Sequence, residues 1–373
     1  MVTGTRGVPQ IQGGVETHCE ELYPRILKRH KTDEITIFRR DGYVSAENKV
    51  TEFKGIKVKS LYSPHSKRFE AIVHTFIAVL YAGITRPDIL HIHAVGPNLL
   101  TPLARLLGLK VVMTHHGPDY ERVKWGRVAK LIIQTGEWCG VKFANKIIVI
   151  SEGIGKSIEQ KYGRTDYTVI PNGVPDAIKN HNTDYLDSLG VGKDKYIFTL
   201  GRFVPEKGFD SLIKAYKNSN ISDEYKLVIA GDADHVSDYS TSLKTMAHAE
   251  GVVLSGFIKG EKLHQLYTNS KLFVLPSNYE GLPISLLEAM SYGCDILASD
   301  IEPNKEVKLP EANYFKTGDI DHMCECLNNK LENKAIIQNY DMCKYNWEDI
   351  AIRTYRVYKS ALGIALVNRK ESS

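Results

Sequence analysis

Residues 277–291 read Ser277-Asn-Tyr-Glu-Gly-Leu-Pro-Ile-Ser-Leu-Leu-Glu-Ala-Met-Ser291 and carry two glutamates, Glu280 and Glu288, eight positions apart. The strand-like residues 271–275 run into this stretch. Pro283 is typical of a first helical turn, because its missing N–H would have no partner there. We therefore predict a strand, a loop with Glu280 and a helix with Glu288. Such a helix start can hold a diphosphate while the carboxylates accept hydrogen bonds from sugar and ribose hydroxyls. An ordinary strand-loop-helix unit shows the same pattern, so a second element is needed.

A second charged segment follows residues 196–200, which are typical of a buried strand. The segment Gly201-Arg-Phe-Val-Pro-Glu-Lys-Gly-Phe209 comes directly after it and brings Arg202 and Lys207 to the carboxyl end of that strand. In open α/β sheets, ligands bind outside the carboxyl ends of the strands, where a guanidinium and an ammonium can hold phosphates. Either residue alone is more often an ordinary solvated charge.

The length of 373 residues exceeds what one hydrophobic core usually serves, so we predict two domains with a cleft between them. Strand-like and helix-like segments alternate in both halves, which indicates α/β domains with parallel sheets. The predicted strands are residues 34–38, 89–93, 110–114, 146–150 and 167–170, followed by 196–200, 226–230, 252–255, 272–275 and 295–298. The predicted domains are 1–174 and 196–346, joined by a polar linker at 175–195, and a helix over 347–366 closes the chain.

The first strand is short: only Met1, Val2 and Thr3 precede Gly4, whereas a buried parallel strand usually has about five residues. Two explanations stay open at this point, a start upstream of Met1 or a short edge strand. The most apolar stretch, residues 72–84, is shorter than a bilayer-spanning helix needs, and we interpret it as a buried helix.

Composition excludes several classes of protein. A net charge of +4 without a basic stripe interleaved with aromatic residues argues against nucleic acid as a partner. The six cysteines are scattered, which argues against a disulfide framework or a zinc site and fits reduced thiols. With no secretory leader at the start, we expect a cytoplasmic protein.

Together, the Gly-Arg…Glu-Lys-Gly segment and the Glu-(seven residues)-Glu motif resemble the family 4 glycosyltransferases of GT-B architecture. The resemblance extends over nearly the whole chain. Its further landmarks are Gly13-Gly14-Val-Glu16, His115-His-Gly-Pro-Asp119, Val149-Ile-Ser-Glu152, Ile170-Pro-Asn-Gly-Val174 and Trp347-Glu-Asp-Ile350. Gly4-Thr-Arg-Gly7 and residues 116–125 look most like bacterial enzymes of surface-polysaccharide synthesis, including rhamnosyltransferase-like members.

The resemblance implies two Rossmann-like domains with parallel sheets that face each other across a cleft, and a last helix that returns to the first domain. It implies retaining transfer of a sugar from a nucleotide diphosphate sugar to a hydroxyl of a glycan or lipid-linked saccharide. The implied catalytic residues are Glu280, His116, Arg202 and Lys207. The implied donor-binding residues are Gly13, Gly14, Arg202, Lys207, Glu280, Gly281, Leu282, Pro283 and Glu288. We expect no cofactor and, because no Asp-x-Asp motif stands at a convincing strand end, no metal.

In the first half of the chain, the residues alone leave alternatives open. The turn at 4–14 is as typical of a structural turn as of a ligand loop, and a lone histidine such as His116 is more often packed or exposed. On the acceptor side, Asp119 can receive a proton, and Arg122 and Lys124 lie in a basic cluster with Trp125 and Arg127. This cluster suits a diphosphate-bearing acceptor or an anionic membrane surface, and equally a solvated helix face. Lys67 and Arg68 could likewise face a membrane.

Three other functions compete with glycosyl transfer. A nucleotide-sugar 2-epimerase shares the GT-B architecture, but we expect it to lack the Glu-(seven residues)-Glu motif. A catalytically inactive nucleotide-binding scaffold would bind a nucleotide without turnover. A dehydrogenase is disfavoured, because no Gly-x-Gly-x-x-Gly segment follows any predicted strand.

Overall fold

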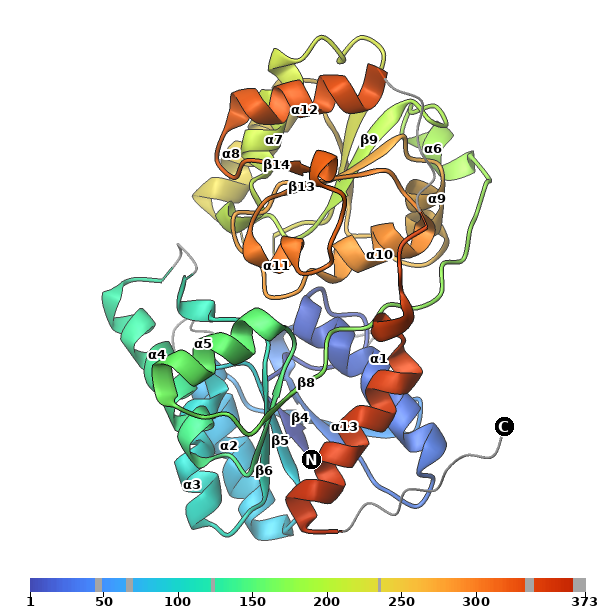
Figure 1. The fold of residues 1–373 in the computed structure, drawn as a ribbon. Coiled ribbons are helices and arrows are strands. Elements are labelled where there is room, and N and C mark those ends of the chain that lie inside the picture. Colours follow the sequence, from blue (N-terminus) through green and yellow to red (C-terminus); the bar gives the residue numbers. More distant parts are fainter. Residues whose placement is uncertain (44–48, 65–69, 122–124, 234–235, 333–338, 365–373) are drawn as a thin grey trace. The chain divides into compact units, whose positions relative to one another are not determined.

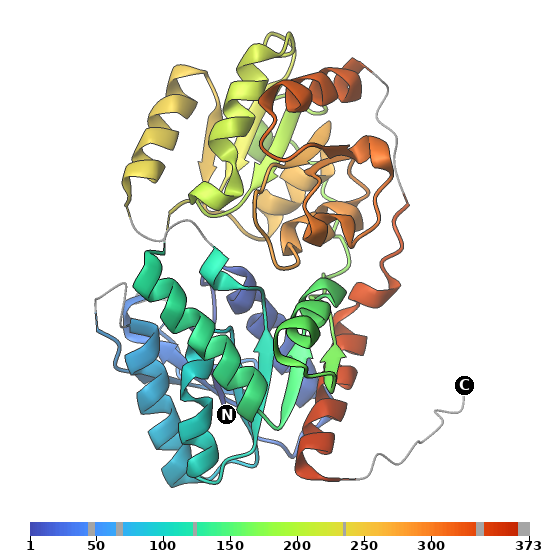
Figure 2. The same ribbon diagram turned by 60° about the vertical axis from the view of Figure 1, so that its left-hand side comes forward.

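The computed structural model describes residues 1–43, 49–64, 70–121, 125–233, 236–332 and 339–364. It divides into two units, Met1–Gly173 with Tyr345–Ser373, and Val174–Lys344. Each unit consists of one sheet with helices on both faces (Figures 1 and 2). The second unit begins before the predicted linker ends, and residues 175–195 contain the short helix α6 (Asp184–Ser188), whose Leu186 is buried.

The sheet of the first unit has the strand order β3-β4-β2-β1-β5-β6-β7-β8. All neighbours are parallel except β3 and β4. The strands are β1 (Val2–Thr3), β2 (Thr36–Arg40), β3 (Glu52–Phe53), β4 (Ile56–Leu61), β5 (Leu90–His93), β6 (Val111–His115), β7 (Lys146–Val149) and β8 (Tyr167–Val169). The helices are α1 (Gly14–Arg29), α2 (Glu70–Thr85), α3 (Thr101–Leu106), α4 (Arg127–Phe143), α5 (Glu152–Tyr162) and α13 (Trp347–Leu362), with 3-10 turns at Asp41–Tyr43, Pro97–Leu100 and Asp119–Glu121.

The sheet of the second unit has the order β11-β10-β9-β12-β13-β14 and is parallel throughout. Its strands are β9 (Tyr196–Leu200), β10 (Lys226–Ala230), β11 (Val253–Gly256), β12 (Leu272–Leu275), β13 (Ile296–Ser299) and β14 (Tyr314–Phe315). Its helices, besides α6, are α7 (Phe209–Asn218), α8 (Asp238–Ala249), α9 (Glu261–Thr268), α10 (Ile284–Tyr292), α11 (Glu302–Lys305) and α12 (Ile320–Glu332), with 3-10 turns at Pro205–Lys207, Glu311–Asn313 and Cys343–Tyr345.

The central strands are apolar runs because helices cover both faces of each sheet. All residues of β6, β12 and β13 are buried. The last helix, α13, packs against α1, and its buried Trp347 and Ile350 belong to the core of the first unit.

The two sheets share one topology. In each, the chain enters at a central strand, β1 or β9, builds one side of the sheet, and then returns to the other side of that strand as β5 or β12. The strand order therefore reverses between β1 and β5 and between β9 and β12. In open α/β sheets, loops at such a reversal leave toward opposite faces, and ligands bind in the crevice outside the carboxyl ends of the two strands.

The prediction of two parallel α/β units is confirmed, and all ten predicted strands are present within two residues of their expected bounds. The sequence pattern did not reveal β3, β4 and β14. The edge-strand explanation for the first strand is wrong, because β1 lies inside the sheet between β2 and β5. The prediction of a buried helix at 72–84 is only partly right: α2 forms there, but Phe76, Leu80 and Ile84 are exposed.

Candidate active site

The loops that follow β9 and β12 are in direct contact in the second unit. The backbone N–H of Asn278 donates to the carbonyl oxygen of Glu206 over 2.9 Å. Gly208 has a φ of 64°, and a Cβ at this position would lie 2.2 Å from the carbonyl oxygen of Pro276. Only glycine permits this close approach, because any side chain would collide with fixed backbone. The Gly-Arg…Glu-Lys-Gly loop and the loop that carries Glu280 therefore form one rigid surface.

An ion pair joins the same two loops. Lys207 Nζ lies 2.5 Å from Glu280 Oε1, and the Ser277 hydroxyl donates to the same oxygen over 2.6 Å. The side chains of Lys207 and Glu280 are only 16% and 11% exposed. Water screens such a pair less than a surface pair, so its charges act more strongly on a ligand. An ammonium has three N–H donors, and Glu280 takes one of them. Lys207 can thus contact an anion while Glu280 keeps it in place.

The second glutamate of the motif lies in the helix, as predicted. Glu288 belongs to α10, and its Oε2 accepts a hydrogen bond of 2.9 Å from the Tyr267 hydroxyl. Pro283 directly precedes α10 in an extended conformation, and Leu282 before it is buried. The first amides of a helix have no intrahelical acceptor, and they carry the positive end of its dipole. The start of α10 therefore offers an anion site next to Glu280.

In the first unit, the loop after β1 is built around a buried ion pair. Arg6 Nη2 lies 3.1 Å from Glu16 Oε2, and both side chains are nearly inaccessible. Gly13 has a φ of 151°, and a Cβ there would lie within 2.4 Å of both charged groups. A Cβ at Gly14, the first residue of α1, would meet no atom within 4 Å. Gly13 thus has a packing role of its own, whereas no described atom restricts Gly14.

His116 follows β6 and belongs to a group of imidazole rings. Its Nε2 lies 2.9 Å from Nδ1 of the buried His93, and its ring packs edge-on against His18. The Tyr23 hydroxyl lies 2.6 Å from His93 Nε2. Burial lowers the pKa of His18 from 6.5 to about 4 and holds the pKa values of His93 and His116 well below 6.5. The group is therefore neutral at pH 7. Among the described residues, His18, His93 and His116 are the set whose side chains could hold a metal ion.

The structure describes only some of the residues near His116 in the sequence and on the predicted acceptor side. His115 is buried, and its Nε2 lies 2.7 Å from Glu137 Oε1, so its role is structural. Asp119 lies in the 3-10 turn after His116 and is partly buried. Arg122 and Lys124, like Lys67 and Arg68, lie outside the described residues. The acceptor-side assignment therefore stays a prediction.

The structure brings some of the predicted residues together and adds others. Lys207 and Glu280 are in contact. Arg202 stands two residues after β9 and is partly buried. Four further residues were not predicted: Ser277 and Tyr267, which hold the two glutamates, and His93 and His18 beside His116. The pattern His-x-His at the end of a predicted strand was a signal for His93, because residues two apart share one face of a strand.

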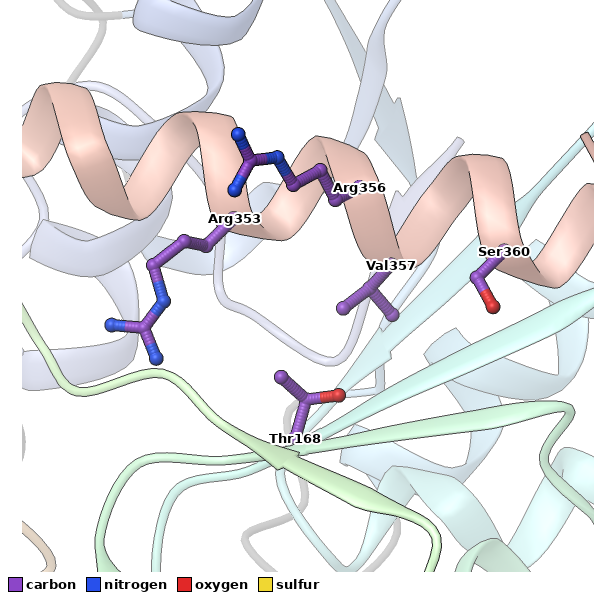
Figure 3. A pocket seen from close by; sticks show the side chains of 5 residues that line it. All are labelled: Thr168, Arg353, Arg356, Val357 and Ser360. Atoms are coloured by element: carbon purple, nitrogen blue, oxygen red, sulfur yellow. The ribbon is translucent and has the colours of Figure 1, made fainter. Parts of the chain in front are cut away.

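A separate cavity lies on the first unit, between β8 and α13. It has a volume of about 300 Å³ and is lined by Thr168, Arg353, Arg356, Val357 and Ser360. Figure 3 shows Thr168 below Val357, with Arg353 on one side and Ser360 on the other. Arg353 donates to the carbonyl oxygen of Val169, which fixes it against the strand. None of the residues predicted for donor or acceptor binding lines this cavity.

Comparisons with known proteins show the family of the chain. Residues 12–177 match the family described as "Glycosyltransferase Family 4", and residues 182–348 match "Glycosyl transferases group 1". An uncharacterized glycosyltransferase of Methanocaldococcus jannaschii is 26% identical over 95% of this chain and 96% of its own. UDP-Gal:alpha-D-GlcNAc-diphosphoundecaprenol alpha-1,3-galactosyltransferase of Escherichia coli is 29% identical over 67% of each chain. The crystal structure of Anabaena HepE in complex with UDP and glucose has a TM-score of 0.77 at 18% identity, covering 96% of this chain and 98% of that one.

The sheets and the two family matches define a glycosyltransferase of the GT-B type. The chain belongs to the family 4 glycosyltransferases, so the predicted family and enzyme class are confirmed. Membership in a transferase family disfavours the epimerase and the dehydrogenase.

Substitution of Gly208 tests the contact between the two loops. Gly208→Ala should lower the free energy of unfolding of the second unit by about 3 kcal/mol or more, because a left-handed alanine is strained and its Cβ would strike Pro276. Gly251→Ala is the matched control in the same unit: its φ is 65°, but no atom lies within 4 Å of its Cβ. It should cost only about 1 kcal/mol. Urea unfolding followed by circular dichroism compares the two variants, and equal losses would show that the contact imposes no constraint.

Proposed function

We propose that this enzyme moves a glycosyl unit from a nucleotide diphosphate sugar to a hydroxyl of a glycan or lipid-linked saccharide in the synthesis of a cell-surface polysaccharide. The reaction retains the configuration at the anomeric carbon and needs no metal. It takes place in the cytoplasm, at the inner face of the cytoplasmic membrane. The observation that carries the proposal is the Lys207–Glu280 pair, shielded from water and held between two loops at the strand reversal of the second unit.

In the second unit, the basic residues and the start of α10 bind the diphosphate in this proposal. Arg202 and Lys207 neutralise the charge that grows on the departing diphosphate, which a site without a metal must do with side chains and amides. Gly281, Leu282 and Pro283 place the backbone at the start of α10, where the helix dipole favours the same anion.

The two glutamates bind the uncharged parts of the donor. Glu280 accepts hydrogen bonds from hydroxyls of the donor sugar and steadies positive charge at the anomeric centre. Glu288, oriented by Tyr267, accepts hydrogen bonds from the ribose. Both functions require ionised carboxylates, which accept hydrogen bonds but do not donate them.

In the first unit, His116 and the start of α1 carry the proposal. A neutral imidazole can donate a hydrogen bond to a sugar hydroxyl without bringing a charge, and His93 fixes the orientation of the His116 ring. Gly13 and Gly14 bring the backbone at the start of α1 toward the donor. Asp119, Arg122 and Lys124 are proposed for the acceptor side, with Asp119 as a candidate proton acceptor.

The named relatives support the choice of substrates. The E. coli relative is named for a UDP-sugar donor and an acceptor on diphosphoundecaprenol, and Anabaena HepE was crystallised with UDP and glucose. We therefore propose a nucleoside diphosphate sugar as donor and a lipid-linked saccharide as the preferred acceptor.

A donor screen tests the proposal as a whole. UDP-, GDP-, ADP- and dTDP-sugars are offered in the presence of EDTA, first for thermal protection and hydrolysis and then with lipid-linked acceptors. We expect one nucleotide class to protect the protein, transfer to proceed in EDTA, and proton NMR of the product to show the anomeric configuration of the donor. Protection without turnover for every acceptor would favour the scaffold. An inverted product, or a requirement for added Mg²⁺, would contradict the proposed mechanism.

The role of Lys207 can be separated from that of an ordinary ion pair. Lys207→Met should lower kcat by about 100- to 1000-fold, because it removes a positive charge from the departing phosphate. Lys217→Met is the matched control, since Lys217 also lies 2.5 Å from a carboxylate, that of Glu250, but on the surface with 59% of its side chain exposed. Steady-state kinetics with the preferred donor compare the two. A Lys207→Met enzyme within about threefold of the wild type would place the diphosphate elsewhere.

An apolar helix layer of the first unit supports contact with the membrane. The helices α2, α3 and α4 lie side by side on one face of the sheet (Figures 1 and 2). Large apolar side chains are exposed on all three; they are Phe76, Leu80, Ile84, Leu106, Val128, Leu131, Trp138 and Phe143. The acidic residues of these helices, Glu70 and Glu137, are buried, whereas Arg127 and Lys142 are exposed. Among the described residues, no helix has the length and apolar character needed to cross a bilayer. Apolar and basic groups on one face suit an anionic lipid surface.

Vesicle sedimentation tests this contact. The protein should pellet with vesicles that contain phosphatidylglycerol, and less with pure phosphatidylcholine or at high salt. The double variant Leu131→Glu/Trp138→Glu should reduce the bound fraction several-fold, because it places two negative charges on the surface of α4. Ile178→Glu is the control, since Ile178 is equally exposed but belongs to the second unit. Equal sedimentation of the two variants would rule out this surface.

A further inference from the structure

Three histidine rings from separate elements of the first unit surround one point. His18 comes from α1, His93 from the end of β5, and His116 from the residue after β6. The ring centroids are 4.9 Å apart for His18 and His116, 5.2 Å for His93 and His116, and 5.6 Å for His18 and His93. One nitrogen of each ring lies within 4.8 Å of the other two. Their sequence positions are far apart, so the strand order of this unit creates the cluster.

Hydrogen bonds behind the rings leave suitable nitrogens facing inward. His18 Nδ1 lies 3.0 Å from Asn172 Oδ1, an acceptor, so Nδ1 carries the proton and Nε2 has the lone pair. His93 Nε2 lies 2.6 Å from the Tyr23 hydroxyl, while its Nδ1 is hydrogen-bonded to His116 Nε2 over 2.9 Å. One of these two facing nitrogens carries the proton of that bond, so one ring must change its tautomer before both can bind a metal. Metal-ligating histidines usually donate their second N–H to an oxygen in this way, which fixes the tautomer and the ring.

We propose that His18, His93 and His116 form a binding site for one divalent transition-metal ion of the Zn²⁺ type. Three imidazoles select Zn²⁺, Co²⁺, Ni²⁺ or Cu²⁺ over Mg²⁺ and Ca²⁺, which prefer oxygen ligands. With Zn–N bonds of about 2.0 Å, the nitrogens of a tetrahedral site are roughly 3.3 Å apart. The present spacing of up to 4.8 Å requires the rings to close by about 1.5 Å, while the His93–His116 pair opens slightly.

The charge of such an ion determines its fourth ligand. Histidine binds a metal as neutral imidazole, so the three rings bring no charge to the site. They do not offset the double positive charge of the ion. A tetrahedral ion takes a fourth ligand, and because of this charge an anion such as hydroxide or a phosphate oxygen fits best. His116 is the least buried of the three, so the open position lies on its side of the cluster.

Metal binding would also affect catalysis. A metal on Nε2 of His116 takes the lone pair of that ring and fixes its direction, so the ring can no longer adjust to a donor sugar. We therefore expect Zn²⁺ to inhibit transfer and EDTA to restore it. This part rests on the proposed function of His116, whereas the binding site itself does not.

Direct metal binding tests the site without any turnover. Protein dialysed against EDTA is titrated with Co²⁺, and the visible d–d absorption of tetrahedral Co²⁺ is recorded; Zn²⁺ is then added to displace it. We expect one equivalent of bound Co²⁺. His18→Asn should weaken binding at least tenfold, and Asn172→Ala should weaken it about 10- to 100-fold, because Asn172 orients His18 without touching the metal.

A second histidine provides the control. His322 lies 3.6 Å from Cys326 Sγ on α12 of the second unit and is the obvious alternative metal ligand. His322→Ala should leave the Co²⁺ spectrum unchanged.

Absence of tetrahedral Co²⁺ in the wild type, or its loss in His322→Ala, would overturn the proposal. If His18→Asn does not fold, the Co²⁺ affinities of Asn172→Ala and His116→Ala decide the question. An unchanged Co²⁺ affinity in both variants would contradict the site. Tight binding without inhibition of transfer would refute the inhibitory role alone.

Discussion

The close approach of Gly208 to the carbonyl oxygen of Pro276 is the constraint on which the site of the second unit depends. It lets the loop after β9 lie against the loop after β12, where Asn278 N–H can reach the Glu206 carbonyl. Lys207 is then close enough to pair with Glu280, and the start of α10 is fixed beside both. These loops meet because β9 and β12 are neighbours, although 71 residues separate the end of one from the start of the other. Strand order thus places a cation, two carboxylates and a helix start at one edge of the sheet.

The first unit uses the same topology with different chemistry. Gly4 again permits a close approach, since a Cβ there would lie 2.0 Å from the carbonyl oxygen of His93, the last residue of β5. Neutral imidazoles lie around this crossing, in addition to the buried Arg6–Glu16 ion pair of the same loop. A charged pair suits the recognition of a diphosphate, and uncharged imidazoles suit a sugar hydroxyl or a soft metal ion. The proposed division of the reaction between the two units rests on these imidazoles and on the Lys207–Glu280 pair.

Much of the fold was predictable because the central strands are buried on both faces and read as apolar runs, as β9, β10 and β12 do. The strand β4 was missed because its Lys57 and Lys59 point to solvent and interrupt such a run. The burial of α2 was overestimated because apolar character alone does not reveal which face meets the core.

At the site, the positions of Glu280 and Glu288 relative to the helix followed from Pro283. The contact of Lys207 with Glu280 did not, because it depends on strand order, which alternation of strands and helices leaves undetermined. The same reason hid His18 beside His116, because their rings meet only in the folded unit.

Hydrogen–deuterium exchange with and without a nucleoside diphosphate measures the central claim most directly, because it locates the bound ligand in the unmodified protein. The nucleotide is the one of UDP, GDP, ADP and dTDP that gives the greatest thermal protection. The account predicts slower exchange in residues 201–209 and 276–288, where the interlocked loops and the start of α10 lie. It would be contradicted if both segments exchanged at unchanged rates while protection appeared elsewhere, for example at residues 353–360 beside the cavity of α13.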